Sequence, residues 1–218
     1  MQQNVPGFRE RLQRRIIFRR AMKKFLQWPE EYVRGDALTH LVYGWGNELW
    51  SGWSEYLGAC VEHALTSSGP ILECGSGLST ILVGAVAQRH GVAHWALEHM
   101  PEWAAKVRTQ LAKYRIDSTV HCGPLKDHGK FLWYDPPMHL IPDSFSLVIC
   151  DGPPGAVKGG RLGLVPVMRA RLGRGCVILL DDAWRQQERQ IADEWKTTLG
   201  ARVELVGQVK PFIRMTLA

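Results

Sequence analysis

The sequence predicts an α/β protein built around a doubly wound, mostly parallel sheet. The first observation is the alternation of apolar strand patterns with amphipathic helix patterns from residue 71 onward. The second is the segment at residues 71–77, ILECGSG, in which an apolar run meets two glycines ahead of a helix-compatible stretch. The third is the strongly apolar run at 145–150, which is typical of a central parallel strand. A chain of 218 residues is long enough to cover such a sheet on both faces.

The N-terminal part predicts one helix, a loop and a second helix. Residues 7–27 predict an amphipathic helix, because their apolar residues recur at three- and four-residue intervals. Residues 28–50 hold glycine, proline and several aromatics and predict a loop. Its aromatics would form a lid over a substrate or a small apolar cluster packed beneath the loop. A helix then continues to about residue 66, where the segment SSGP ends it. We therefore assign residues 1–66 to an extension and residues 67–218 to a ligand-binding domain.

The rest of the chain predicts seven strands and the helices between them. The strands are expected at 71–74, 92–97, 118–122, 145–150, 176–180, 202–206 and 211–217. The helices are expected at 78–89, 101–114, 164–172 and 184–199, with an irregular segment before the fourth strand. Only four residues separate the last two strands, too few for a parallel crossover, so these strands should pair antiparallel.

Basic charge is concentrated near the N-terminus. Residues 8–26 hold eight arginines and lysines against Glu10 alone, a net charge of +7. The whole chain has a net charge of +6, so the remainder is close to neutral. A basic amphipathic helix of this kind can bind an anionic membrane surface or nucleic acid. The alternative is a helix packed on the domain with its arginines in solvent, and we favour it because charge runs are usually solvated faces.

Cysteine usage and hydropathy bear on the compartment. The five cysteines match no zinc or redox spacing, which indicates reduced thiols in a cytoplasmic protein. No apolar run approaches the about 20 residues that a membrane span needs. We therefore expect a cytoplasmic protein, with peripheral membrane contact through residues 8–26 as the alternative.

The segment ECGSGLST at residues 73–80 resembles the first motif of class I S-adenosylmethionine-dependent methyltransferases, E/D-x-G-x-G. Thr80 stands where the dinucleotide fingerprint needs its third glycine, and Glu73 would repel a pyrophosphate at the helix N-terminus. S-adenosylmethionine carries an ammonium and a sulfonium and has no phosphate, so an acid suits it. The resemblance covers about residues 67–218 and implies a seven-stranded Rossmann-like sheet with an antiparallel last strand.

By this resemblance a set of residues would hold S-adenosylmethionine. They lie in the glycine turn and at the ends of the next strands: Glu73, Gly75, Ser76, Gly77, Ser79, Glu98, Leu125 and Asp151. Glu98 ends the second strand, where an acid can accept hydrogen bonds from both ribose hydroxyls.

Three carboxylates at neighbouring strand ends predict a second feature. Asp151 follows the fourth strand, and Asp181 and Asp182 follow the fifth. Like charges this close repel each other unless something positive lies between them, and oxygen ligands suit Mg²⁺. The layout is similar to the cation-dependent O-methyltransferases, which implies Asp151, Asp181 and Asp182 as metal ligands. In the alternative, Asp151 contacts the substrate or the cofactor directly and Asp182 caps the helix that begins near Ala183.

The residues and the resemblance together predict a methyltransferase that acts on a hydroxyl of a small molecule or a sugar-type compound, with Asp151 as the catalytic residue. The candidate general bases also include His99, His121, His128 and His139. One alternative is a non-catalytic membrane- or partner-binding protein on the same fold. Another is a nucleic-acid methyltransferase, which is disfavoured because the segment DPPM precedes the fourth strand and lacks the aromatic residue that would stack on a base.

Overall fold

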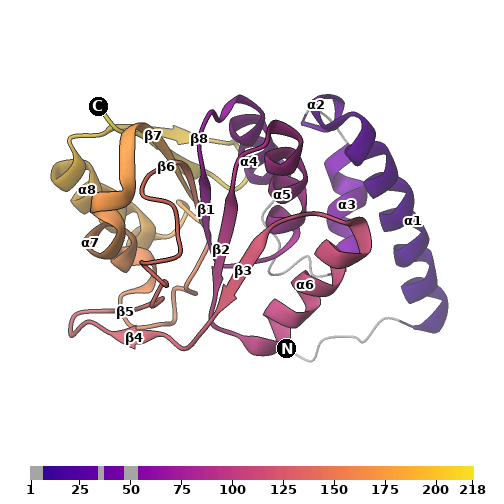
Figure 1. Cartoon of the computed structure of the whole chain (residues 1–218), viewed down its shortest axis with the longest axis horizontal. Coiled ribbons are helices and arrows are strands. Elements are labelled where there is room, and N and C mark those ends of the chain that lie inside the picture. Colours follow the sequence, from indigo (N-terminus) through magenta and orange to yellow (C-terminus); the bar gives the residue numbers. More distant parts are fainter. Residues whose placement is uncertain (1–6, 34–36, 47–53) are drawn as a thin grey trace.

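The computed structural model of the protein describes residues 7–33, 37–46 and 54–218. Its centre is a seven-stranded sheet in the order β3-β2-β1-β6-β7-β9-β8 (Figure 1). The strands are β1 (Ile71–Cys74), β2 (His94–Glu98), β3 (Thr119–Cys122), β6 (Phe145–Cys150), β7 (Leu172–Leu180), β8 (Arg202–Val206) and β9 (Phe212–Thr216). Neighbouring strands from β3 to β7 are parallel, and β9 pairs antiparallel with both β7 and β8. The predicted doubly wound sheet and its antiparallel ending are confirmed.

Helices cover both faces of this sheet (Figure 1). One face carries α4 (Ser54–Thr66), α5 (Leu78–His90) and α6 (Pro101–Tyr114), and the other carries α7 (Leu164–Met168) and α8 (Gln186–Leu199). Successive strand residues serve opposite faces, as the pleat requires, so Ile71 packs with the first group and Leu72 with the second. The strand order reverses between β1 and β6, and in such sheets ligands bind at the carboxyl ends of the strands beside this point.

The N-terminal helices pack onto the α4–α5 side. They are α1 (Phe8–Gln27), α2 (Pro29–Tyr32) and α3 (Ala37–Trp45). Helix α1 buries Phe18, Met22 and Phe25 in the same apolar core as the sheet residues, so the predicted packing of this helix on the domain is confirmed. No helix in the described part of the chain combines the length and apolarity that crossing a membrane requires.

The loop predicted at 28–50 is wrong where the structure has α2 and α3. Leu38, Leu41 and Trp45 recur at three- and four-residue spacing and are buried, and this burial stabilises α3 despite its glycine. The Trp45 ring packs against those of Phe18 and Trp103, with centroids 5.9 and 6.0 Å apart, so this aromatic belongs to the core and not to a lid. Residues 34–36 and 47–50 of the proposed lid lie outside the described residues.

The chain differs from the prediction around the fourth and fifth strands. A two-stranded hairpin, β4 (Lys126–Asp127) with β5 (Leu132–Trp133), lies within the segment predicted as irregular. The predicted helix 164–172 is shorter: α7 passes into the 3₁₀ turn η2 (Arg169–Arg171), and β7 begins at Leu172 because this residue already pairs with Phe145. The 3₁₀ turn η1 (Gly160–Gly163) precedes α7.

Candidate active site

A sharp turn joins β1 to α5 at the carboxyl edge of the sheet. Gly75 has a φ of +94°, which favours glycine, and a Cβ on it would lie 3.4 Å from the backbone nitrogen of Gly152 at the end of the neighbouring strand β6. Gly77 is extended, and the nearest described atom to a Cβ placed on it is Ser79 Oγ at 4.0 Å. The turn therefore leaves open space beside Gly77, where a ligand can reach the backbone at the start of α5.

Glu73 lies inside the protein beneath this turn. Its side chain is 1% exposed, one carboxylate oxygen accepts a hydrogen bond from the Ser79 hydroxyl, and the other lies 3.5 Å from His94 Nε2. The bond from Ser79 ties the end of β1 to the first turn of α5, while His94 lies at the start of β2, so Glu73 and Ser79 fix the shape of the glycine turn. Their direct contact with a cofactor stays a prediction.

Glu98 stands at the end of β2 beside the same turn. The Ser76 hydroxyl donates to one of its carboxylate oxygens at 2.7 Å, and the backbone N–H groups of His99 and Met100 donate to the other at 2.7 and 2.9 Å. Burial opposes ionisation, but these hydrogen bonds lower the pKa of Glu98 below its usual value, so the group is a carboxylate at neutral pH. It is an acceptor of the kind that a ribose diol needs.

Two more predicted residues border this region. Ser76 also accepts a hydrogen bond through its carbonyl from the Trp103 indole, which attaches the turn to α6. Leu125 follows β3, is half-buried and packs against the core on the α7–α8 side.

The three predicted aspartates do come together. One carboxylate oxygen each from Asp151, Asp181 and Asp182 lies within 4.8 Å of the others. They differ in access: 31% of the Asp151 side chain and 15% of the Asp182 side chain is exposed, while Asp181 is buried. Asp151 is therefore the member that a substrate can reach most readily.

A buried arginine lies among these acids. Arg161, 2% exposed, donates from Nη2 to a carboxylate oxygen of Asp151 and to one of Asp182, both at 2.8 Å. Its Nη1 donates to Glu188 at 3.0 Å and to the backbone carbonyl of Asp181 at 3.2 Å. Although burial opposes it, the surrounding carboxylates raise the pKa of Arg161 further, so the guanidinium is a permanent cation in the cluster.

The acids in this cluster respond differently to their surroundings. Burial and the neighbouring Asp181 raise the pKa of Asp151 well above its usual range, and Arg161 opposes that shift. Burial and Asp182 raise the pKa of Asp181 to about 6. Burial alone would raise the pKa of Asp182, but Arg161 and Arg185 lower it below its usual value. Asp182 is thus the fixed anion, and Asp151 and Asp181 are the groups that take up protons most easily.

The alternative reading of Asp182 as a helix cap is wrong. Helix α8 begins at Gln186, two residues later than predicted, and its N-cap Arg185 makes no side-chain capping bond. Asp182 has a φ of +59°. Its carboxylate instead accepts hydrogen bonds from the Trp184 indole at 3.1 Å and from Arg161 at 2.8 Å, and it forms an ion pair with Arg185 at 3.0 Å. An aspartate tolerates this left-handed backbone better than most residues.

A metal ion would have to share this space with Arg161. The donor set of three carboxylates suits Mg²⁺, but oxygens of Asp151 and Asp182 are already bridged by one guanidinium nitrogen. A second positive charge between them would be repelled by the first. In this arrangement the three carboxylates fit the guanidinium of Arg161 better than they fit a metal ion.

Sequence reasoning missed three side chains that shape the site. Arg161 had one signal, its place in a glycine-rich loop ten residues after Asp151. Tyr134 is buried, its hydroxyl has no hydrogen-bond partner among the described residues, and a Cβ on Gly152 would lie 2.4 Å from that hydroxyl. His94 is buried beside Glu73, and no sequence pattern marks it.

The four candidate histidines lie in different surroundings. His99 lies next to Glu98 at 3.3 Å, His121 is half-buried, His128 stacks on a phenylalanine ring, and His139 is exposed.

Solved structures share this architecture. The O-methyltransferase from Bacillus cereus in complex with S-adenosylhomocysteine superposes with a TM-score of 0.59 at 14% identity, over 77% of this chain and 82% of that chain. The S-adenosylhomocysteine-bound methyltransferase PaMTH1 of Podospora anserina gives 0.61 at 16% identity over 100% of both chains. This is the fold of the S-adenosylmethionine-dependent methyltransferases. The O-methyltransferase TomG of Streptomyces achromogenes, in complex with S-adenosylmethionine, gives 0.55 at 14% identity over 91% of this chain and 89% of that chain.

Sequence comparison adds nothing to this likeness. No protein-family model matches the chain, and no curated protein matches it either. At such low identities the likeness establishes the methyltransferase fold, and activity has to be argued from the site.

Proposed function

We propose that the protein is an S-adenosylmethionine-dependent methyltransferase that methylates a hydroxyl group of a small molecule. The observation that carries the proposal is the open glycine turn at Gly77, flanked by the buried carboxylate Glu98 and the accessible carboxylate Asp151 on one edge of a methyltransferase sheet. The backbone of the turn gives a cofactor a surface without side chains, and Glu98 offers its oxygens to a ribose. S-adenosylmethionine supplies the electrophilic methyl group.

Asp151 is the proposed proton acceptor. Although 31% of its side chain is exposed, the rest of the carboxyl group is shielded from water. This desolvation and the neighbouring Asp181 raise its pKa against the opposing effect of Arg161, which makes its carboxylate a better base than an ordinary aspartate. A hydroxyl placed beside Asp151 would pass its proton to this carboxylate as its oxygen takes the methyl group. Holding the two reactants in line accounts for the larger part of the rate enhancement in such reactions.

Arg161 is proposed to take the place of the cation at the three aspartates. Its contacts with Asp151 and Asp182, both at 2.8 Å, supply the positive charge that the cluster needs and hold Asp151 in one orientation. Magnesium at Asp151, Asp181 and Asp182 is the competing prediction, because the ligand chemistry by itself favours it. The two hypotheses predict different effects of a chelator: it would stop the reaction if magnesium is needed, and would leave it unchanged if Arg161 supplies the positive charge.

Isothermal titration calorimetry of the full chain with S-adenosylmethionine and S-adenosylhomocysteine tests the cofactor. Gly77→Val should abolish binding without unfolding, since the extended backbone accepts valine and the added side chain would occupy the open space. Gly7→Val is the matched control, because Gly7 has a φ of −62° and no described atom within 4 Å of a Cβ. A wild-type protein that binds neither compound would contradict the proposal.

A panel of hydroxylated small molecules with radiolabelled S-adenosylmethionine tests the reaction. Asp151→Asn keeps the shape and should lower kcat by about 10²-fold or more while cofactor binding persists, because the amide cannot accept the proton. Unchanged turnover in that variant would move the search for the base to His99.

A further inference from the structure

Helix α1 carries a second apolar stripe that does not face the core. Phe8, Leu12 and Ile16 are 75%, 49% and 44% exposed and follow one another at four-residue spacing. Leu12 lies about 120° around the helix from Phe18, which marks the buried face. The helix is therefore apolar on two sides, and only one of them is covered by the described residues.

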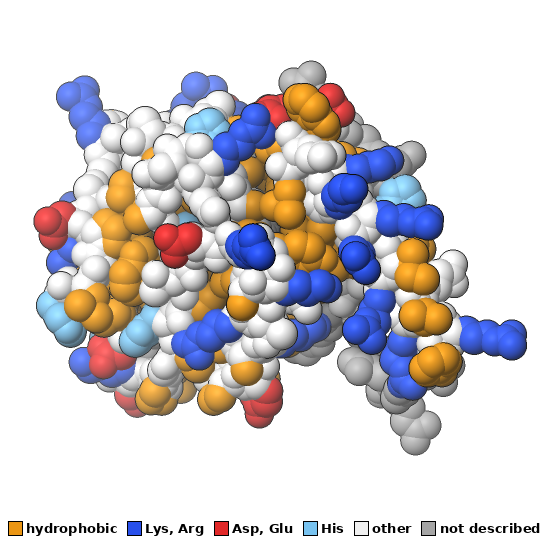
Figure 2. All heavy atoms as spheres, turned by 45° about the vertical axis from the view of Figure 1, so that its right-hand side comes forward, with side chains coloured by type: hydrophobic (Ala, Val, Ile, Leu, Met, Phe, Trp, Pro, Cys, Tyr) orange, Lys and Arg blue, Asp and Glu red, His pale blue; other side chains and the backbone are white. Residues whose placement is uncertain are grey.

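Basic side chains surround this stripe. At about 100° per residue, Arg15, Arg19 and Lys23 lie on the same side of α1 as Leu12, and all three are exposed. The only acid of the helix, Glu10, is taken up by an ion pair with Arg14 at 2.9 Å. Figure 2 shows apolar atoms along α1 with lysine and arginine side chains around them.

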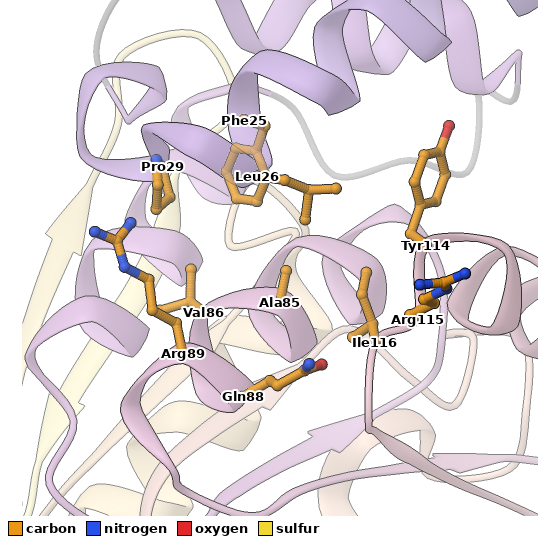
Figure 3. A pocket seen from close by; sticks show the side chains of 10 residues that line it. All are labelled: Phe25, Leu26, Pro29, Ala85, Val86, Gln88, Arg89, Tyr114, Arg115 and Ile116. Carbon is orange, nitrogen blue, oxygen red and sulfur yellow. The ribbon is translucent and has the colours of Figure 1, made fainter.

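A groove continues this surface toward the body of the protein. It has a volume of about 280 Å³ and lies between the end of α1, α5 and the segment after α6. Leu26 and Pro29 face Val86 and Ile116 across it, and Arg115 stands at its rim (Figure 3). Most of the residues that line the groove are apolar, and the second arginine that lines it, Arg89, is paired with Glu30 at 3.3 Å. Figure 2 shows apolar atoms and several lysine and arginine side chains on this face of the molecule.

We propose that this outer face, formed by the stripe of α1 and the groove beside it, docks on an anionic lipid surface. Apolar side chains that enter the headgroup boundary, together with cations that meet anionic headgroups, are the two features that interfacial helices combine. A second copy of the chain fits less well, since a two-fold contact would bring Arg15, Arg19 and Lys23 against their own counterparts. Nucleic acid would satisfy the cations but leave the stripe without an apolar partner.

Vesicle flotation with the full-length protein tests the proposal. We expect binding to vesicles of phosphatidylcholine with about one-third phosphatidylglycerol, little binding to pure phosphatidylcholine, and loss of binding when salt rises from about 0.1 to about 0.5 M. Deleting α1 is not a usable variant, because Phe18, Met22 and Phe25 belong to the core. Point substitutions on the exposed side avoid this problem.

Two variants separate the apolar and charged parts of the face. F8S/L12S/I16S should lower the partition coefficient at least tenfold, and R15Q/R19Q/K23Q should lower it about hundredfold, at about fivefold per cation. Their matched controls, L205S/V209S on the β8–β9 hairpin and K130Q/R174Q/K196Q elsewhere on the surface, should bind like wild type. Circular dichroism checks that each variant is folded. If F8S/L12S/I16S does not fold, Phe8→Ser alone takes its place.

Several results would overturn the proposal. They are equal binding to neutral and anionic vesicles, no vesicle binding, and equal losses in the stripe variant and its control. A concentration-dependent dimer that F8S/L12S/I16S abolishes, without vesicle binding, would assign the face to a second copy. Binding of an oligonucleotide that depends on Arg15, Arg19 and Lys23 but not on Phe8, again without vesicle binding, would assign it to nucleic acid. None of these results bears on cofactor binding at Gly77, so the methyltransferase proposal is tested separately.

Discussion

Replacing Arg161 with methionine would remove the one buried cation that bonds to Asp151, Asp182 and Glu188 in the described structure, while keeping an unbranched side chain in its place. The wild-type guanidinium donates to all three carboxylates at 2.8–3.0 Å and also to the backbone carbonyls of Asp151 and Asp181. Glu188 is fully buried and would be left without its partner on Arg161, and Arg185 Nη1, at 3.8 Å, is the next nearest cation. The variant therefore exposes the cost of uncompensated negative charge.

The expected loss is large. Removing one partner of a buried ion pair costs about 3–5 kcal/mol, because the remaining charge stays buried without compensation. More than one carboxylate is affected here, but Asp151 and Asp182 are partly exposed, so the free energy of unfolding should fall by about 4 kcal/mol near pH 8, the middle of that range. A domain with a total stability of about 5–15 kcal/mol should remain measurably folded.

The pH dependence separates charge from packing. The pKa values of Asp151 and Asp181 are raised in the folded protein, that of Asp181 to about 6, against about 3.9 for an unfolded aspartate. An acid whose pKa is raised in the folded state stabilises that state by holding its proton more tightly there. This contribution is complete below about pH 4, the unfolded pKa, and is lost as the pH rises through about 6, the folded pKa of Asp181. Without Arg161 these pKa values rise further, and the stability lost at pH 8 should be partly regained at pH 5.

Urea titrations at pH 5 and pH 8 measure this difference. Leu164→Ala, a fully buried neighbour in α7, is the matched control and should cost about 2–5 kcal/mol at both pH values, because it leaves a cavity without changing charge. Arg161→Lys should fall between wild type and Arg161→Met, since it keeps the charge but loses the two-pronged geometry. The reasoning is refuted if Arg161→Met loses the same stability at both pH values, as Leu164→Ala should.

Three further predictions follow from the same structure. Asp181→Asn keeps the acceptor for the Asp182 N–H and should be more stable than wild type by about 1–3 kcal/mol at pH 8, with the difference vanishing near pH 4 in urea titrations. Excess chelator should leave methyl transfer in a radiolabel assay unchanged, and loss of activity restored by Mg²⁺ would show that Arg161 does not replace the metal. Met22→Ala should cost about 2–5 kcal/mol of unfolding free energy while Leu12→Ala, on the exposed side of α1, costs almost nothing; equal losses would mean that the two faces of α1 are assigned wrongly.

The sheet was predictable because its signals are local. The apolar run at 145–150 is flanked by turn residues, and the glycine pair at Gly75 and Gly77 marks a strand–helix junction, so neither needs long-range information. Helix α3 was missed because its glycine and aromatics resemble loop composition. Its stability comes from burying Leu38, Leu41 and Trp45 against α1, and such tertiary packing overrides local preference.

The acidic part of the site was predictable and its cation was not. Asp151, Asp181 and Asp182 converge because adjacent parallel strands end at the same edge, which the sequence order already implies. Arg161 belongs to a glycine-rich loop without periodicity. Only the 3₁₀ turn η1 and the burial of its guanidinium decide that it enters the cluster, while neighbouring basic residues such as Lys158 stay exposed.

Arg161 also bears on how Asp151 can work as a base. The carboxyl groups of Asp151, Asp182 and Glu188 surround one guanidinium, and Arg185 lies 3.0 Å from Asp182, so the cluster holds more acidic groups than basic ones. Proton uptake by Asp151 reduces that excess, and this favours transfer of the substrate proton to Asp151. The hydrogen bond that Arg161 donates to Asp151 opposes proton uptake until a substrate proton is close. Replacing the guanidinium by a divalent cation would reverse this balance, because stronger attraction to the carboxylate would make it a weaker base. A cluster built around Arg161 therefore suits proton acceptance by Asp151, whereas one built around Mg²⁺ would require a base elsewhere.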